Sequence, residues 1–168
     1  MTSIWPNNFE NVTGAVLSSC REYRYVLWRK WSEQAQPLVF LMLNPSTADE
    51  TEDDRTIKRC IHFAKREGAG GIIVGNIFAL RSSAPASLYA ASDPVGPEND
   101  HWVETICRNA FKVVAAWGNE RITQHRIPAI LSLLKSKNIS LCCLKKNKNG
   151  SPRHPLYCHD GSPFIPYP

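Results

Sequence analysis

Polar residues that could bind a ligand follow a short apolar run near position 40. Leu38–Leu43 is continuously apolar, and it is followed at once by Asn44, Pro45, Ser46 and Thr47. A short apolar run that stops at a turn signal is typical of a strand buried on both faces. Because ligands of open α/β sheets bind at the carboxyl ends of strands, these four residues are candidate ligand-binding residues. The alternative interpretation is an ordinary Asn-Pro turn followed by a helix cap.

Two further apolar runs also end in polar residues. Gly71–Leu80 contains Asn76 and leads into Arg81, and Phe111–Trp117 leads into a glycine and then Asn119. The carboxyl ends of parallel strands meet at the same edge of a sheet. We therefore expect these side chains to gather beside the first group.

Strand and helix patterns alternate along the rest of the chain, as a parallel sheet requires. Strands are expected at Glu22–Trp31, Leu38–Leu43, Gly71–Leu80, Phe111–Trp117 and Ile139–Leu144, and helices at Ala48–Gly68, Glu98–Asn109 and Ile122–Lys135. Right-handed crossovers between such strands place helices on both faces of the sheet. The sequence predicts one α/β domain over residues 1–168. It is a three-layer α/β/α sandwich with a central, mostly parallel sheet of about four strands. The N-terminal strand is expected to pair antiparallel with Leu38–Leu43.

Three segments lack a clear period. Residues 1–20 are expected to be loosely structured, and residues 84–99 carry three prolines and are expected to form a long loop. Residues 151–168 are rich in proline, which excludes regular structure through much of the segment. Because this tail follows the fourth parallel strand, we expect it to bring His154 to the same edge as Asn44.

The composition is that of a globular protein, with 43% hydrophobic and 21% charged residues. The net charge of +5 is compatible with a polyanionic partner such as nucleic acid. Met1–Glu10 has no apolar signal-peptide core, and no run approaches the roughly 18 apolar residues that span a membrane. We therefore expect no membrane partner, a cytoplasmic location and six cysteines that are mostly free thiols.

No cofactor or metal is predicted. The chain has no Gly-x-Gly-x-x-Gly or phosphate-loop motif, so a nucleotide cofactor is not indicated. His154, Cys158 and His159 are of metal-ligand type, but their spacing matches no standard zinc pattern. An iron–sulfur cluster would need four well-placed cysteines, which the spacing does not indicate.

Six segments resemble a bacterial and phage family described only as a domain of unknown function. They are MLNPSTAD (42–49), DDRTIKRC (53–60), GNIFALR (75–81), GPEND (96–100), AWGN (116–119) and PRHPLY (152–157). The resemblance runs from about Arg21 to Tyr167, which is nearly the whole chain.

Four segments, in chain order, also resemble motifs of the uracil-DNA glycosylase superfamily. They are LMLNPS (41–46), GGIIVGNIFALRSSAP (70–85), VVAAWGN (113–119) and RHPLY (153–157). This resemblance implies the glycosylase-like fold and a nucleobase pocket at the strand ends. Two positions depart from the motifs: Ser46 stands where a glycine is usual, and Leu156 where a serine is usual. Both departures favour binding without catalysis.

Hydrolysis of an N-glycosidic bond needs a positioned water and a donor that stabilises the departing base. Asn44 could hold the water through its amide oxygen, and His154 could donate to a base carbonyl. Asp54 could orient Asn44 or activate the water. The structural alternatives are a turn asparagine, a loop histidine and an acid that favours a helix N-terminus.

The remaining candidates would contact the base or a phosphate. The base- or substrate-binding candidates are Pro45, Ser46, Thr47, Asn76, Phe78, Arg81, Asn99 and Asn119. The phosphate-binding candidates are Lys145, Lys146, Lys148 and Arg153. The alternatives are a core position for Phe78, a solvated Arg81 and a helix cap for Asn99.

The sequence therefore predicts a protein with a pocket for a nucleobase, in nucleic acid or in a nucleotide-like ligand. It could be an N-glycosidic hydrolase that acts on a modified or deaminated base. The alternatives are a non-catalytic nucleic-acid or nucleotide binding module, and an enzyme acting on a free nucleotide-like small molecule.

Overall fold

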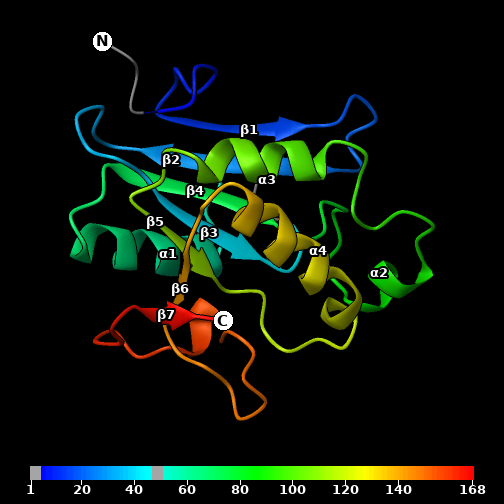
Figure 1. The fold of residues 1–168 in the computed structure, drawn as a ribbon. Coiled ribbons are helices and arrows are strands. Elements are labelled where there is room, and N and C mark those ends of the chain that lie inside the picture. The colour runs from blue at the N-terminus through cyan, green and yellow to red at the C-terminus, as the bar shows by residue number, and fades with distance from the viewer. Residues whose placement is uncertain (1–4, 47–50) are drawn as a thin grey trace.

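The chain folds around one mixed β-sheet (Figure 1). The structure is a computed structural model that describes residues 5–46 and 51–168. In those residues the strands are β1 (Thr13–Leu17), β2 (Arg24–Lys30), β3 (Leu38–Met42), β4 (Gly71–Asn76), β5 (Lys112–Ala115), β6 (Leu141–Cys143) and β7 (Ile165–Tyr167). The helices are α1 (Arg55–Arg66), α2 (Ala86–Ala90), α3 (Asn99–Cys107) and α4 (Thr123–Ser136), with a short 3-10 helix, η1 (Pro155–Tyr157).

Four parallel strands form the centre of the sheet, as the alternating pattern predicts. The strand order is β1-β2-β4-β3-β5-β6-β7. Strands β4, β3, β5 and β6 are parallel to their neighbours within this central group, whereas β1, β2 and β7 pair antiparallel. In the parallel register Met42 lies beside Asn76 and Leu41 beside Ala115. The ends of β3, β4 and β5 therefore meet at one edge of the sheet.

Strand β2 pairs with β4, and the expected pairing with β3 is wrong. Strand β3 has β4 on one side and β5 on the other, so both of its edges are occupied. Strand β2 therefore takes the outer edge of β4, where Leu27 lies beside Val74. Because β2 is antiparallel to β4, the beginning of β2 lies at the edge where β4 ends.

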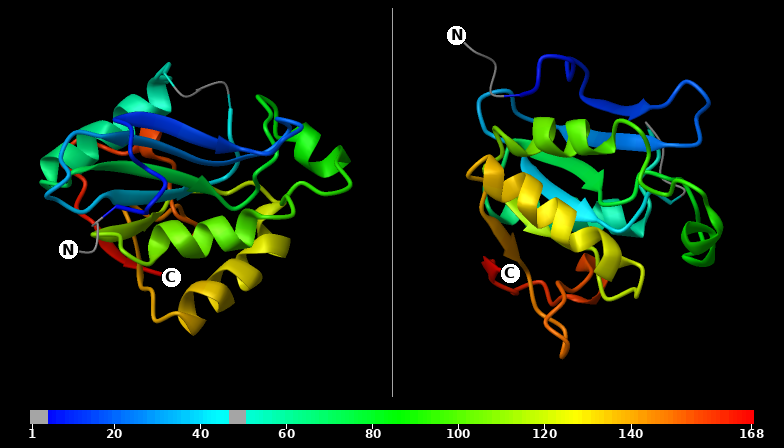
Figure 2. Two further views of the ribbon diagram at one scale, coloured as in Figure 1. Left: turned by 90° about the horizontal axis from the view of Figure 1, so that it is seen from above. Right: turned by 45° about the vertical axis from the view of Figure 1, so that its right-hand side comes forward.

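Helices cover both faces of the sheet (Figure 2). Helix α1 presents Ile57, Cys60, Phe63 and Ala64 to one face, at the spacing of an amphipathic helix. On that face the buried strand residues include Phe40. Helix α1 begins at Arg55, so Glu52, Asp53 and Asp54 precede the helix and do not form its first turn.

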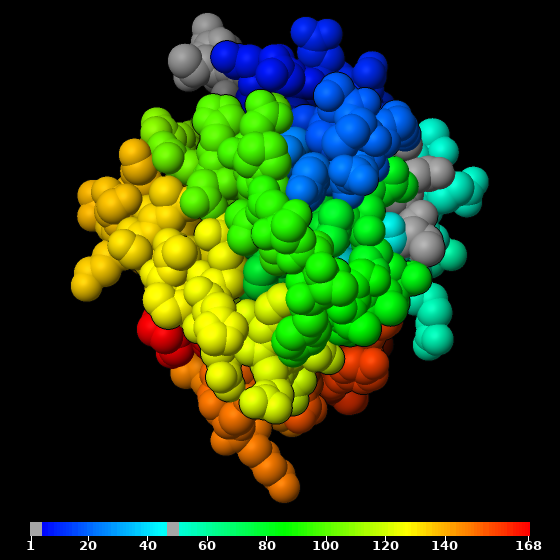
Figure 3. Space-filling view, turned by 90° about the vertical axis from the view of Figure 1, so that its right-hand side faces the viewer, coloured from blue at the N-terminus to red at the C-terminus, as the bar shows by residue number. Residues whose placement is uncertain are grey.

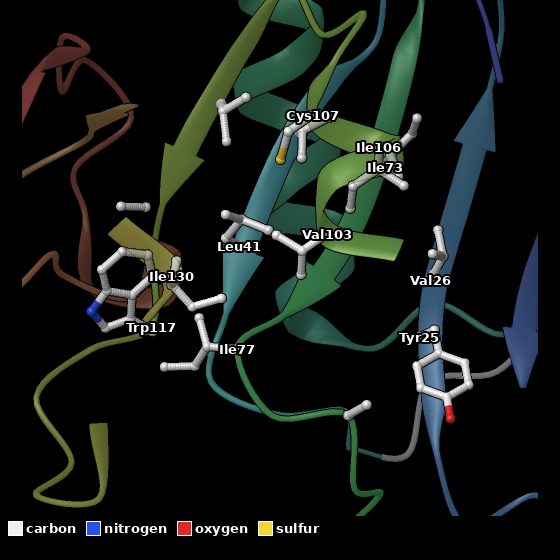
Figure 4. Packing of buried hydrophobic residues seen from close by; sticks show 14 of the residues in the cluster. Tyr25, Val26, Leu41, Ile73, Ile77, Val103, Ile106, Cys107, Trp117 and Ile130 are labelled. Carbon is white, nitrogen blue, oxygen red and sulfur yellow. The ribbon is translucent and has the colours of Figure 1, made fainter. Parts of the chain in front are cut away.

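Helices α3 and α4 cover the opposite face (Figure 4). Val103 of α3 and Ile130 of α4 pack in one cluster with Leu41 and Ile73 of the central strands. Together the two clusters leave the central strands buried on both sides. Among the described residues no helix is long and apolar enough to cross a membrane.

The N-terminal segment is part of the core, contrary to the expectation of a loose start. Phe9 is 1% exposed, and its ring stacks on that of Trp28 with 4.1 Å between centroids. The indole of Trp28 also donates to the carbonyl of Asn11 at 3.0 Å. Strand β1 then crosses the same indole at Gly14, where a Cβ would lie 2.1 Å from the ring. Single aromatic anchors hold this segment, so it shows no periodic pattern.

The two proline-rich segments also contain regular structure that was not expected. Helix α2 lies inside the predicted loop 84–99. In the tail, η1 contains Pro155, and β7 pairs with β6 through Pro166 opposite Cys142. Proline is tolerated in β7 because this strand lies at the edge of the sheet. All six cysteines of the chain are free thiols.

Replacing Phe9 with alanine should destabilise the protein strongly. Loss of a fully buried phenylalanine that stacks on Trp28 should lower the free energy of unfolding by about 3–5 kcal/mol. Urea unfolding followed by tryptophan fluorescence would measure the change. The control is Val12→Ala at a position that is 66% exposed, which should shift the free energy by less than about 0.5 kcal/mol. Equal effects of the two substitutions would contradict the buried N-terminal segment.

Candidate functional site

A cleft of about 440 Å³ lies where β3, β4 and β5 end. Figure 3 faces this edge of the sheet, and the green segment that contains α2 lies over part of it. This segment is fixed to the start of α4, because the hydroxyl of Tyr89 accepts from the Ile122 backbone N–H at 3.0 Å. The polar and aromatic side chains that line the cleft include Arg24, Asn44, Ser46, Asp54, Asn76, Trp117, Asn119, Glu120, His154 and Tyr157.

The main chain fixes the orientation of the Asn44 amide. Its Nδ2 donates to the carbonyl oxygens of Pro45 (3.1 Å), Leu80 (3.3 Å) and Ser82 (3.0 Å). Three acceptors around one amide nitrogen set the rotation of the side chain and therefore the position of Oδ1. Asn44 lines the cleft, and none of the described residues donates to its Oδ1. This oxygen is therefore a fixed acceptor with capacity for a ligand or a water molecule.

Asp54 caps α1 and joins it to the segment that follows β3. Its Oδ1 accepts from the Ile57 backbone N–H at 2.8 Å, as an N-cap does. Its Oδ2 accepts from the Ser46 hydroxyl at 3.1 Å. Both carboxylate oxygens therefore have structural hydrogen bonds, so Asp54 sets the shape of the cleft wall.

His154 is held as a neutral hydrogen-bond donor. Its Nδ1 accepts from the Leu156 backbone N–H at 3.2 Å, which requires Nδ1 to be unprotonated. The neutral imidazole then carries its proton on Nε2. Burial lowers the pKa of His154, and the nearby Asp54 carboxylate opposes part of that shift. The ring can therefore donate from Nε2 without carrying a positive charge.

Asn76 places a second donor in the wall of the cleft. Its side chain is 2% exposed, and none of the described residues accepts from its Nδ2. Side chains alternate along a strand, so Asn76 points to the same face as Val74, which packs on the α1 side. A buried donor without an acceptor is costly, and an acceptor on a bound ligand would remove that cost.

A buried network behind the cleft holds the end of β4. Asn99 Nδ2 donates to the carbonyls of Asn76 (2.9 Å) and Ile77 (3.3 Å). Arg126 Nε donates to the same Ile77 carbonyl at 2.8 Å, and its guanidinium pairs with Asp100. Asn99 is thus neither a cleft residue nor a helix cap. It supports Asn76 from behind.

The structure brings together six of the residues proposed from the sequence. Asn44, Ser46, Asp54, Asn76, Asn119 and His154 all line the cleft. The other candidates of the first strand end lie elsewhere: Pro45 is buried outside the lining, and Thr47 falls outside the described residues. Phe78 belongs to the core, and the Arg81 guanidinium donates to the Arg21 carbonyl at 3.2 Å.

The four basic candidates of the C-terminal segment do not line the cleft. Lys145, Lys146 and Lys148 are exposed, and Lys146 donates to the Pro168 carbonyl at 2.9 Å. Arg153 is partly buried, and its Nε donates to Asn147 Oδ1 at 3.0 Å. These side chains lie on the turn that leads to His154, outside the cleft itself.

The cleft lining also contains side chains that were not singled out from the sequence, among them Arg24, Trp117, Glu120 and Tyr157. Trp117 could have been found, because it immediately precedes Gly118 and Asn119 at a predicted strand end. Tyr157 lies three residues after His154, and its ring centroid is 5.8 Å from that of His154. The sequence pattern did not indicate that Arg24 lies in the cleft, because a charged residue inside a strand pattern is usually solvated.

In the described part of the chain, no three His, Cys, Asp or Glu side chains lie close enough together to hold a metal ion. The chemical groups that line the cleft are amides, carboxylates, hydroxyls, an imidazole, a guanidinium and aromatic rings.

Comparison with known proteins gives a match to a family model. A family model described as "Protein of unknown function (DUF1643)" matches residues 24–156. No curated protein and no solved structure matches the chain. The matched range extends from Arg24, the first residue of β2, to Leu156 in η1.

Two substitutions of Asp54 should distinguish the helix-capping role of its side chain from the effect of its negative charge. Asp54→Ala should lower the free energy of unfolding by about 1 kcal/mol, because the Ile57 N–H loses its acceptor. Asp54→Ser keeps a capping oxygen and should retain most of that stability. Urea unfolding would measure both variants. If Asp54→Ala were as stable as the wild type, the cap would not hold α1.

Acid should weaken the fold through His154. Its pKa is lower in the folded protein than its ordinary value of 6.5, so the unfolded chain binds this proton more readily. His154 should therefore reduce stability as the pH falls below 6.5 toward the folded pKa, and should have no such effect above 6.5. NMR titration of His154, and the pH dependence of unfolding in wild type and His154→Gln, would test this. A titration midpoint above 6.5 would contradict the burial argument.

Proposed function

The chain belongs to the DUF1643 family, and we propose that its cleft binds a nucleobase and hydrolyses the N-glycosidic bond of a modified or deaminated base. The observation that carries this proposal is the fixed amide of Asn44. Three carbonyls hold its nitrogen, and its oxygen is left as an oriented acceptor in the cleft. Such an acceptor can position a water molecule for attack.

In the proposed reaction, a water molecule donates one hydrogen bond to Asn44 Oδ1 and attacks the anomeric carbon of the sugar. The new C–O bond forms as the C–N bond breaks, and the bonding electron pair leaves with the base. The water proton ends on the departing base or in solvent. A neutral amide is a weak base, so turnover is slow and favours bases that leave readily.

His154 stabilises the departing base. Its Nε2–H can donate to a base oxygen on which negative charge develops, because Nδ1 is occupied by the Leu156 N–H. A neutral imidazole in a partly buried site keeps its proton better than an imidazolium would. It therefore strengthens the hydrogen bond to the base without completing a proton transfer.

In the proposed complex the base is recognised by Asn76, Asn119 and Tyr157. Asn76 offers a buried amide donor, and Tyr157, which is 73% exposed, supplies aromatic surface. Amides pair with the donors and acceptors on a base edge, and aromatic rings stack on its face. Tyr157 takes the stacking role that the sequence suggested for Phe78, because Phe78 and Trp117 both belong to the core cluster.

The four segments that resemble glycosylase motifs also support the proposal. Asn44, Asn76, Asn119 and His154 come one from each segment, and all four line the same cleft. We infer on this basis a three-layer α/β/α sandwich of the uracil-DNA glycosylase type and, from the free cysteines, a reducing cytoplasmic location.

A binding module without catalysis is the second candidate. Asp54 is the carboxylate that the sequence proposed for activating the water, and both of its oxygens already accept hydrogen bonds. The departures at Ser46 and Leu156 also line the cleft. In this alternative, the same groups recognise the base, and the water at Asn44 is absent or unreactive.

Base release from defined substrates should distinguish the two candidates. The substrates are single- and double-stranded oligonucleotides that carry uracil, hypoxanthine, or oxidised or hydroxymethylated pyrimidines, together with the matching nucleosides and nucleotides. Alkaline cleavage detects abasic sites, and chromatography detects free base. Asn44→Ala and His154→Ala should each lower the release rate about 100- to 1000-fold.

The matched control is His125→Ala, because His125 is exposed on α4 and does not line the cleft. It should retain the wild-type rate. Release that is equal in wild type, Asn44→Ala and His154→Ala would exclude hydrolysis in this cleft. Saturable binding without release from any substrate would favour the binding module.

A further inference from the structure

We propose that Arg24 binds a phosphate monoester, so that the natural ligand of the cleft is a nucleotide monomer. This inference rests on the proposed nucleobase pocket and adds the class of its ligand. Arg24 is the first residue of β2 and lines the cleft although it is 4% exposed. A buried guanidinium in a cleft wall is suited to a phosphate, which it can meet with two parallel hydrogen bonds.

The sheet order sets the position of Arg24 relative to the other cleft groups. Along this edge the strands follow the order β2, β4, β3, β5. The corresponding residues are Arg24, Asn76, Asn44 and Asn119. His154 immediately precedes η1, which lies on the far side of β5 from β2 (Figure 1). The cation and the imidazole therefore lie at opposite ends of a line of amides. Three strand spacings amount to roughly 14 Å, which suits a base, a sugar and a phosphate in sequence.

The acidic residues of the cleft make its two ends electrostatically different. Asp54 lies near enough to His154 to affect its pKa, and Glu120 follows β5 at the same end. Both carboxylates disfavour a phosphate near His154. The phosphate end of a ligand is thus directed to Arg24, and the base end to His154, where the proposed leaving-group contact lies.

The other basic residues favour a monomer over a polymer. The exposed lysines Lys145, Lys146 and Lys148 lie outside the cleft lining, on the turn that leads to His154. A polymer held through its backbone would need cations along a continuous track on both sides of the base. Among the described residues that line the cleft, Arg24 is the only arginine or lysine, and it is buried. A buried cation can contact a small terminal phosphate more easily than it can contact the phosphate of a continuing nucleic-acid strand.

Calorimetric binding of matched pairs would test the inference. The probes are uridine with uridine monophosphate, inosine with inosine monophosphate, and the corresponding deoxy compounds. In the wild type, each monophosphate should bind about 10- to 100-fold more tightly than its nucleoside. Arg24→Gln should remove this preference and leave nucleoside binding unchanged. Arg24→Lys should keep part of it, because an ammonium makes no bidentate contact.

Arg29→Gln is the matched control. Arg29 lies on the same strand and is 5% exposed, but it pairs with Asp53 and does not line the cleft. It should retain the full phosphate preference. If Arg24→Gln does not fold, as judged by thermal unfolding, Arg24→Lys compared with Arg29→Lys carries the same test.

Four outcomes would overturn the inference. Equal affinity for nucleoside and monophosphate, or a preference that persists in Arg24→Gln, would remove the phosphate contact and leave the nucleobase pocket intact. An oligonucleotide without terminal phosphates that binds as tightly as the monophosphate would remove the preference for a monomer. If no probe binds, the proposed nucleobase pocket fails, and the inference fails with it.

Discussion

The central position of β3, paired in parallel with β4 on one side and β5 on the other, is the constraint on which the rest of the structure depends. Parallel pairing brings three strand ends to one edge, and each of them carries or leads into an asparagine. It also requires crossover helices on both faces, so the central strands are buried and the polar residues that follow them form the cleft. Because β3 has no free edge, β2 lies beyond β4, and this places Arg24 in the cleft.

The polar groups of the cleft are held by the backbone and by buried side chains. Three carbonyls orient Asn44, the Leu156 N–H fixes His154, and Asn99 supports the carbonyl of Asn76. Groups held in this way keep their positions when a ligand arrives and require little reorganisation. This property distinguishes the cleft from an ordinary gap between loops, and it applies equally to catalysis and to recognition without catalysis.

Some features of the fold could be predicted from the sequence and others could not. Long apolar runs identified the four parallel strands, because burial on both faces leaves a signal that does not depend on distant partners. The N-terminal segment left none, since Phe9 contributes through one stacking contact and Gly14 through close approach to an indole. The partner of β2 was also wrongly predicted. A short connector favours neighbours in sequence, whereas the order of strands is decided by competition for edges across the whole sheet.

The sequence by itself determined the α/β class, the parallel core and the polar residues at the strand ends, including Asn44, Asn76 and Asn119. These features depend on local hydrophobicity and turn chemistry, which a chain carries in each short window. Only the tertiary structure decided that Arg24 reaches the same cleft, that Phe78 lies in the core, and that Tyr157 lines the cleft. The position of a side chain depends on which strands become neighbours and which faces are covered, and both arise from contacts between residues far apart in the sequence.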